Sequence, residues 1–283
     1  MKILITGSNG QLGNEFRLLE NHNRQHAFFF TDVEELDITN KTAVLNYVQD
    51  NQIELIINCA AYTAVDRAEN DEPVARLINA LAVLNLGEVA SEVGAKIIHV
   101  STDYVFSGNA FVPYKETDSP NPVSAYGRTK LEGEQLLQQA CADAVIIRTA
   151  WLYSEFGNNF VKTMIRLGKE RDSLNVVYDQ VGSPTYAADL AAAIMTIVNA
   201  DKWVAGIYHF TNEGVCSWYD FTIAIHQLAG IQCDINPIRS EQYPTPTERP
   251  HYSVLDKQKI RDTYEVNVPH WYEALQRCIE KML

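Results

Sequence analysis

The sequence predicts an α/β protein with a doubly wound parallel sheet and a second, smaller mixed α/β domain. Over the first 150 residues, short apolar segments alternate with helical ones, and a glycine-rich turn follows the first segment. Strands that alternate with helices at this spacing form right-handed βαβ units. Beyond Thr149 the pattern loosens. We therefore expect residues 1–150 and about 185–212 to bind a dinucleotide, and about 151–184 and 213–283 to form a substrate domain.

The predicted strands of the first domain are nearly all apolar, as is typical of strands buried on both faces. They are Lys2–Thr6, Ala27–Thr31, Leu55–Asn58, Lys96–Thr102 and Ala144–Thr149. The helices expected between them are Gln11–Glu20, Lys41–Gln49, Glu72–Val93 and Ser124–Gln139. Gly94 ends the third of these helices as a C-cap.

The second half is less regular. We expect helices at Asn158–Lys169 and Ala187–Val198, strands at Leu174–Tyr178 and Ile207–Phe210, and a last helix after Pro269. The segment Tyr243–Tyr252 holds three prolines, which predicts an irregular loop. Its length and side chains suit a ligand-facing loop.

Composition excludes several classes of protein. The chain has 283 residues, 46% hydrophobic and 21% charged, with a net charge of −13, so neither nucleic acid nor an anionic membrane is expected as a partner. No apolar run has the length of a membrane span or a signal sequence. The five cysteines are scattered and form no metal-binding cluster. We expect a cytoplasmic protein with reduced thiols and no zinc.

Gly7, Gly10 and Gly13 follow the first strand directly and open the first helix with the spacing GxxGxxG. Glycine lets the backbone turn tightly and approach a pyrophosphate, and the helix N-terminus offers free N–H groups. A plain strand–helix turn would explain one glycine, but the strand–helix context favours a dinucleotide site of the Rossmann type.

Asp32 ends the second strand, 19 residues after Gly13. A carboxylate there accepts hydrogen bonds from an adenosine ribose and repels a 2′-phosphate. No Lys or Arg stands between Lys2 and Arg17, so the glycine loop lacks a counter-charge. We expect NADH to be used at least as well as NADPH. Asp37 and Ile38 are expected to border the adenine; the alternative for this pair is a helix N-cap.

Tyr126 and Lys130 lie four residues apart and share one face of a predicted helix. An ammonium beside a phenol lowers the phenol's pKa and makes tyrosine a usable general acid. Thr102 ends the fourth strand, and parallel sheets bind ligands beyond the carboxyl ends of their strands. A hydroxyl, a tyrosine and a lysine can therefore converge beside the cofactor.

Several motifs together resemble the extended short-chain dehydrogenase/reductase family, and they span most of the chain. They are GxxGxxG, NxAAYTAVDxAE at Asn58–Glu69, STDYVFSG at Ser101–Gly108, YGxTK at Tyr126–Lys130, RTAWLY at Arg148–Tyr153, GNNFVKTM at Gly157–Met164, DQVGSPT at Asp179–Thr185 and YPTPTERP at Tyr243–Pro250. The resemblance implies the reduction of the 4-keto group of a dTDP-linked 6-deoxy sugar, which yields dTDP-L-rhamnose.

The resemblance also implies roles for residues. Tyr126 would protonate the sugar carbonyl oxygen, Lys130 would lower the pKa of Tyr126 and hold the nicotinamide ribose, and Thr102 would polarise the carbonyl. Asn79 would position a water, with a buried structural amide as the alternative. The remaining cofactor positions implied are Gly10, Gln11 and Leu12 at the pyrophosphate, and Ala61, Tyr62 and Thr63 at the ribose and phosphate.

Val65, Asp103, Trp151 and Arg249 resemble substrate-contacting positions. A core tryptophan and a surface arginine are the alternatives for the last two. A different nucleotide-sugar ketoreductase, an epimerase or a non-catalytic subunit are the alternative functions. Tyr104 stands where related dehydratases have Glu, and the intact Tyr126–Lys130 pair disfavours a non-catalytic subunit.

The resemblance allows a homodimer. Some family members dimerise through magnesium held by acidic residues, and Glu15 is placed for such a role. The sequence offers no full set of ligands, so no metal site is assigned.

Overall fold

The computed structural model describes residues 1–283, and a six-stranded parallel sheet forms its centre. The strand order is β10-β5-β4-β3-β1-β2. The strands are β1 (Lys2–Thr6), β2 (Ala27–Thr31), β3 (Leu55–Asn58), β4 (Lys96–Thr102), β5 (Val145–Thr149) and β10 (Gly206–His209). The chain passes from β1 to β2 on one side and then to β3 on the other, so the order reverses between β1 and β3. The predicted doubly wound sheet is confirmed.

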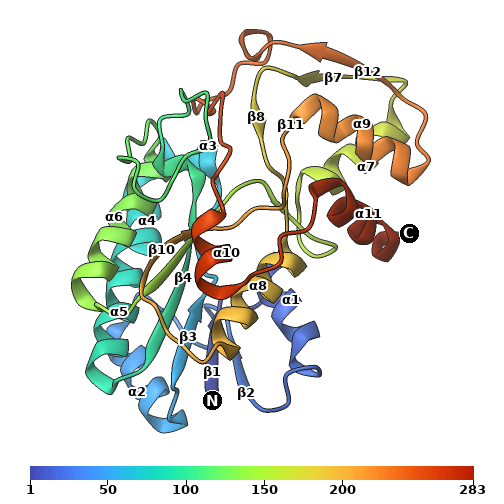
Figure 1. Ribbon diagram of the computed structural model, residues 1–283. Coiled ribbons are helices and arrows are strands. Elements are labelled where there is room, and N and C mark those ends of the chain that lie inside the picture. The colour runs from blue at the N-terminus through green and yellow to red at the C-terminus, as the bar shows by residue number, and fades with distance from the viewer.

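Helices cover both faces of this sheet, as Figure 1 shows. One face packs against α2 (Lys41–Asn51), α5 (Ala82–Val93) and α6 (Ala125–Ala140). The other packs against α1 (Gln11–Glu20), α8 (Ala187–Asn199) and α10 (Gln258–Tyr264). Each face has its own buried apolar cluster, which explains why the strands lack a polar face.

The remaining elements form a second lobe with a separate core, seen at the upper right of Figure 1. They are β6 (Leu152–Tyr153), α7 (Phe160–Glu170), β7 (Ser173–Val177), β8 (Val181–Gly182), β9 (Thr185–Tyr186), β11 (Cys216–Ser217), α9 (Trp218–Ala229), β12 (Asp234–Ile238) and α11 (Trp271–Met282). After this lobe the chain returns to the sheet, because Ile260, Tyr264 and Val266 belong to the core beside α8.

The helix expected at Glu72–Val93 is continuous but not uniformly α-helical. It consists of α4 (Glu72–Arg76), a π-helical turn η1 (Leu77–Leu81) and α5. By length and composition this helix could cross a membrane, but half of that apolar window is buried inside the fold. It packs between α2 and α6, which is the setting of a core helix in an α/β domain.

Short elements follow several strands. They are α3 (Val65–Ala68) after β3, η2 (Asp103–Val105) after β4 and η3 (Ser240–Gln242) after β12. The segment Tyr243–Tyr252 has no helix or strand, as expected from its prolines.

Candidate active site

A cavity of about 670 Å³ lies beyond the carboxyl ends of the sheet strands, at the point where the strand order reverses. This is where open α/β sheets bind ligands. Most of the predicted site residues line it: Gly7, Gly10, Gln11, Leu12, Asp32, Asp37, Ile38, Ala61, Thr63, Val65, Thr102, Asp103, Tyr126, Lys130 and Trp151. Gly13, Tyr62, Asn79 and Arg249 do not line it.

The turn between β1 and α1 needs glycine at two positions. Gly7 has φ +63°, and a Cβ there would lie 2.6 Å from backbone atoms of Ala60. A Cβ on Gly13 would lie 2.4 Å from Cα of Ser8, so only glycine lets α1 pack so closely on the loop. No side chain caps the N-terminus of α1. Its free N–H groups and positive dipole end suit a pyrophosphate.

Asp32 is held by the backbone at the rim of the cavity. Its two carboxylate oxygens accept hydrogen bonds from the N–H groups of Asn9 at 3.0 Å and of Val33 at 2.8 Å. The sequence argument that the glycine loop lacks a counter-charge is wrong. Nη2 of Arg17 donates to Oγ of Ser8 at 2.8 Å and to Oδ1 of Asn9 at 3.4 Å. Arg17 reaches the loop because helical side chains lean toward the N-terminus of their helix.

Asp37 and Ile38 lie at the other end of the same wall. Oδ1 of Asp37 accepts hydrogen bonds from the backbone N–H and the hydroxyl of Thr39. The N-cap of α2 is Asn40, whose side chain accepts from Ala43, so Asp37 does not cap this helix. Ile38 is buried and faces the cavity, where an adenine ring would find an apolar contact.

Thr102 and Tyr126 meet on the cavity wall beside Asp103. The Thr102 hydroxyl donates to Oδ1 of Asp103 at 3.0 Å. Burial raises the pKa of Tyr126, and a hydrogen bond with Thr102 opposes that rise. Burial also raises the pKa of Asp103 to about 7, against hydrogen bonds that lower it, of which the one from Thr102 comes first. Oδ2 of Asp103 is itself buried, so the residue borders the cavity without exposing this oxygen to it.

Lys130 lies one helical turn after Tyr126 and is 1% exposed. Its Nζ donates to the carbonyl oxygen of Val100 at 2.8 Å and lies 3.2 Å from Nε2 of His99. Burial lowers the pKa of Lys130 to about 8, while the negative charge of Glu134 opposes this. The lysine is therefore held by β4, and its pKa lies near neutrality.

Asn79 lies in the π-helical turn with its side-chain amide fully used by the protein. Its Oδ1 accepts from the N–H of Tyr62 at 2.9 Å, and its Nδ2 donates to the Tyr62 carbonyl at 3.1 Å. Nδ2 also donates to the Thr129 hydroxyl at 3.3 Å. The structure thus places Asn79 as the support of the segment after β3.

Trp151 has φ +50°, a strained backbone conformation for a bulky residue. Its indole lines the cavity and stacks on Trp218, with ring centroids 3.4 Å apart. The stack explains how the strained residue is held with one face toward the cavity. No sequence motif pointed to Trp218.

Arg249 comes from the proline-rich loop, which folds over α3. Its guanidinium donates to Oδ2 of Asp66 at 2.7 Å and to the hydroxyl of Tyr104 at 3.1 Å. Tyr104 lines the cavity, whereas Arg249 is one side chain behind it. The cavity wall also contains Gly157 and Asn158, which belong to the predicted GNNFVKTM motif but were given no role.

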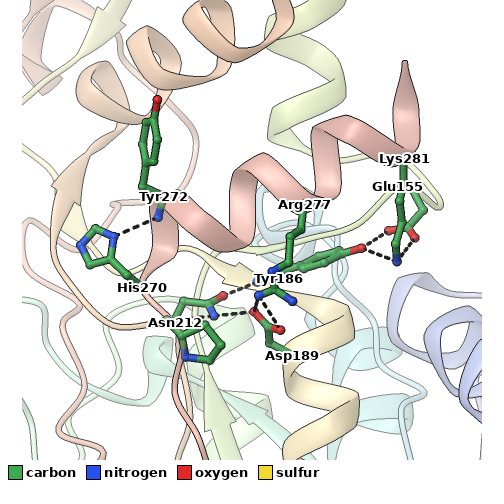
Figure 2. A network of polar contacts seen from close by, with 9 residues as sticks. Glu155, Tyr186, Asp189, Asn212, His270, Tyr272, Arg277 and Lys281 are labelled. Carbon is green, nitrogen blue, oxygen red and sulfur yellow. Dashed lines mark hydrogen bonds and ion pairs between the residues drawn. The ribbon is translucent and has the colours of Figure 1, made fainter.

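Glu15 is buried beneath the second lobe, away from the cavity. Its carboxylate accepts from the Ser154 hydroxyl at 2.8 Å. The pKa of Glu15 is raised to about 7, mainly by burial. Next to it, Glu155 accepts from Tyr186 at 2.8 Å and from Lys281 at 2.9 Å (Figure 2). The structure contains no group of three or more His, Cys, Asp or Glu side chains that could hold a metal ion.

The sheet topology, the glycine turn and the Thr102–Tyr126–Lys130 grouping define an oxidoreductase of the Rossmann class. The family described as RmlD substrate binding domain matches residues 1–283, and the chain belongs to that family. A dTDP-4-dehydrorhamnose reductase of Aggregatibacter actinomycetemcomitans is 43% identical over 97% of both chains.

Solved structures agree with this family. The crystal structure of a dTDP-4-dehydrorhamnose reductase from Clostridium acetobutylicum has a TM-score of 0.96 and 46% identity, covering 100% of this chain and 99% of that one. The same enzyme from Bacillus anthracis, solved in complex with NADP, has a TM-score of 0.94 and 40% identity, covering 99% of both.

Proposed function

We propose that this chain reduces the 4-keto group of dTDP-4-dehydro-6-deoxy-L-mannose to give dTDP-L-rhamnose. The observation that carries the proposal is the meeting of Thr102, Tyr126 and Lys130 on the wall of a cavity that also contains the glycine turn. The full-length similarity to dTDP-4-dehydrorhamnose reductases supports the choice of substrate. The distant likeness to epimerases, at 19% identity, supports the fold alone.

The cavity fits a nicotinamide dinucleotide. The free N–H groups of α1 would hold its pyrophosphate, Asp32 its adenosine ribose, and Ile38 its adenine. A bound nicotinamide supplies the hydride that reduces the carbonyl carbon. NADH and NADPH are both proposed as cofactors, because Asp32 and Arg17 oppose each other in charge at the ribose end of the site.

Each catalytic residue has a proposed step. The Tyr126 hydroxyl gives its proton to the carbonyl oxygen. The Thr102 hydroxyl turns from Asp103 and donates its single proton to the same oxygen, which stabilises the developing negative charge. Lys130 supplies positive charge and a proton near Tyr126. Asp103, which lines the cavity beside Thr102, accepts from a sugar hydroxyl.

On the substrate side, Trp151 covers a sugar face with its strained, stacked indole. Val65 lines the same part of the cavity. Arg249 holds the Tyr104 hydroxyl by a hydrogen bond. The positive charge of Arg249, behind Tyr104, attracts the diphosphate. The division into a dinucleotide domain and a substrate domain is proposed with the predicted boundaries. Residues near Ile260 additionally attach the end of the chain to the first domain.

We further propose a cytoplasmic location and a homodimer. All five cysteines are free thiols, which suits a reducing compartment. Val74 and Leu77 expose apolar side chains, each 41% exposed, on the outer side of the α4–η1 helix. Light scattering of the purified protein tests the dimer.

The decisive experiment is the loss of NAD(P)H absorbance with dTDP-4-dehydro-6-deoxy-L-mannose, with the dTDP-L-rhamnose formed identified by mass spectrometry and NMR. The corresponding uridine-linked keto sugar is the matched substrate. We expect turnover with the thymidine sugar. Binding of cofactor and sugar without turnover would indicate a non-catalytic subunit, and inversion without loss of NAD(P)H would indicate an epimerase.

A further inference from the structure

Three buried polar side chains form a row beneath Lys130. Thr6, Asn58 and His99 are direct partners in the register of β1, β3 and β4, and they are 1%, 0% and 0% exposed. Two residues earlier on each strand, the same face carries an apolar side chain of the core. Packing alone does not require polar groups here, and buried polar groups must satisfy one another.

The hydrogen bonds fix which way the amide of Asn58 faces. Its Oδ1 accepts from the backbone N–H of Ala60 at 3.1 Å and from the Thr6 hydroxyl at 2.6 Å. A backbone N–H can only donate, so the oxygen must face Ala60. The amide nitrogen therefore faces Nδ1 of His99, at 3.0 Å.

This orientation determines the tautomer of His99. Nδ1 accepts a hydrogen bond from Asn58 and so carries no proton. Burial, aided by the positive charge of Lys130, holds the pKa of His99 well below its usual range. The ring is neutral, and its single proton is on Nε2, which lies 3.2 Å from Nζ of Lys130. An ammonium has no acceptor lone pair, so this N–H can bond only to the neutral amine form of Lys130.

We propose that His99 is a positioning residue for the reduction: it donates from Nε2 to the amine that Lys130 becomes after giving a proton to Tyr126. This proposal rests on the proposed function. The Tyr126 O–H bond breaks as its proton goes to the carbonyl oxygen, and an N–H bond of Lys130 breaks as its proton goes to the phenolate. A proton from solution then returns Lys130 to the ammonium, so the reduction consumes one hydride, which a bound nicotinamide supplies, and one proton from the solvent.

The surroundings of Lys130 agree with this role. Burial lowers the pKa of Lys130 to about 8, which suits a group that gives and regains a proton near neutral pH. The nearby acid on the same helix is Glu134, whose carboxylate is bound by Arg148 of β5 and by the Ser101 hydroxyl of β4. Since Glu134 is already paired, it favours the ammonium of Lys130 less than a free carboxylate would.

The tautomer of His99 is measured directly by long-range ¹H–¹⁵N correlation NMR of ¹⁵N-histidine-labelled, ligand-free enzyme. The His99 signals are identified by their loss in His99→Phe or, if that variant does not fold, by their movement in Asn58→Asp. We expect a protonated Nε2 and an unprotonated Nδ1 across pH 6–9. A protonated Nδ1 would overturn the proposal.

The titration of Lys130 is followed through its ¹³Cε resonance, assigned as the lysine signal absent from Lys130→Met. His99→Phe removes the donor, and Asn58→Asp reverses the tautomer so that Nε2 accepts from the ammonium. Both should raise the pKa of Lys130 by about one unit or more. In Asn58→Asp a hydrogen bond to the charged form replaces repulsion, and in His99→Phe the hydrogen bond that favours the neutral amine is lost. Thr6→Val is the control, since it leaves the Asn58–Ala60 bond and the tautomer intact, and it should not move this pKa.

The same variants have a kinetic signature. The alkaline limb of the kcat profile should move to higher pH in Asn58→Asp and stay in place in Thr6→Val. An unchanged or lowered Lys130 pKa in both Asn58→Asp and His99→Phe would refute the role of His99. The NMR readouts need no substrate, so they test this inference even if the chain does not reduce the keto sugar.

Discussion

The choice between NADH and NADPH depends on two opposite charges at the rim of the cavity. The Asp32 carboxylate is fixed by the N–H of Asn9, and the Arg17 guanidinium binds the side chain of the same Asn9. A 2′-phosphate on the adenosine ribose would be repelled by Asp32 and attracted by Arg17. We expect NADH to be used at least as well as NADPH, with the gap kept small by Arg17.

The expected magnitude follows from Coulomb's law. Two unit charges at about 6 Å interact by roughly 1.4 kcal/mol when the effective dielectric constant is about 40, a value for a half-exposed site. A change of about 1.4 kcal/mol is tenfold in affinity. Asp32→Asn should therefore strengthen NADPH binding relative to NADH about tenfold. Arg17→Met, which keeps the contact with the Phe30 ring, should weaken it about tenfold.

The assay is the dissociation constant of each cofactor, measured by fluorescence at low and high salt. Arg24→Met is the control, because Arg24 is exposed and binds only the carbonyl of Asn21 at the end of the same helix. The double variant Asp32→Asn/Arg17→Met should return the NADPH/NADH ratio close to that of the wild type. Ratios within about threefold of the wild type in both single variants would refute the electrostatic argument.

The remaining predictions concern the catalytic and substrate sides of the cavity. Tyr126→Phe should lower kcat by roughly 10²–10⁴-fold while cofactor binding survives, because only the proton donor is lost; near-normal turnover removes Tyr126 from the mechanism. Trp151→Phe and Trp218→Phe should each lower the free energy of unfolding by ~1 kcal/mol, because each weakens the indole stack. Only Trp151→Phe should also raise KM for the sugar. Equal KM values in the two variants, measured where both are folded, would make Trp151 purely structural. Asp103 binds its proton more tightly in the folded chain, with a pKa of about 7 against the usual 3.8, so the free energy of unfolding falls as pH rises through that window. Asp103→Asn should remove this fall, so the free energy of unfolding of the variant should rise relative to that of the wild type by about 2–3 kcal/mol between pH 5 and 8. If urea unfolding gives the same pH dependence for both proteins, the prediction is wrong.

The first domain could be predicted from local patterns because most residues of its strands are apolar. Lys2–Thr6 and Leu55–Asn58 have the same bounds in the structure as in the prediction. The π-helical turn could not be predicted, since its cause is a tertiary contact. A Cβ on Gly133 of α6 would lie 2.0 Å from the carbonyl oxygen of Asn79, so the turn is shaped by the helix packed against it.

The start and the end of α9 have signals in the sequence. Ser217 and Asp220 form a capping box at the start of α9, and Gly230 ends that helix in the left-handed conformation. The reach of Arg17 back to the glycine loop follows from the lean of helical side chains, which spacing between charged residues alone does not reveal.

The roles of Arg249 and of the second lobe depend on contacts between segments far apart in the chain. Arg249 bonds Asp66 and Tyr104, so the proline-rich loop supports Tyr104 in the cavity wall. The last helix, α11, contacts the segment that leads into α7. Its Lys281 binds Glu155. Asn159, in the same segment as Glu155, donates to the Gln11 side chain at 2.9 Å.

The link from α11 to the cofactor end has a structural consequence. Arg277 of α11 pairs with Asp189 of α8, so the last helix is tied to both lobes at once (Figure 2). The 154–159 segment, which carries the cavity-lining Gly157, is bound on one side by α11 and on the other by α1. The end of the chain therefore supports this part of the cavity wall without lining the cavity itself. Because the 154–159 segment contacts both α1 and α11, residues of the second lobe and of the glycine turn line one cavity.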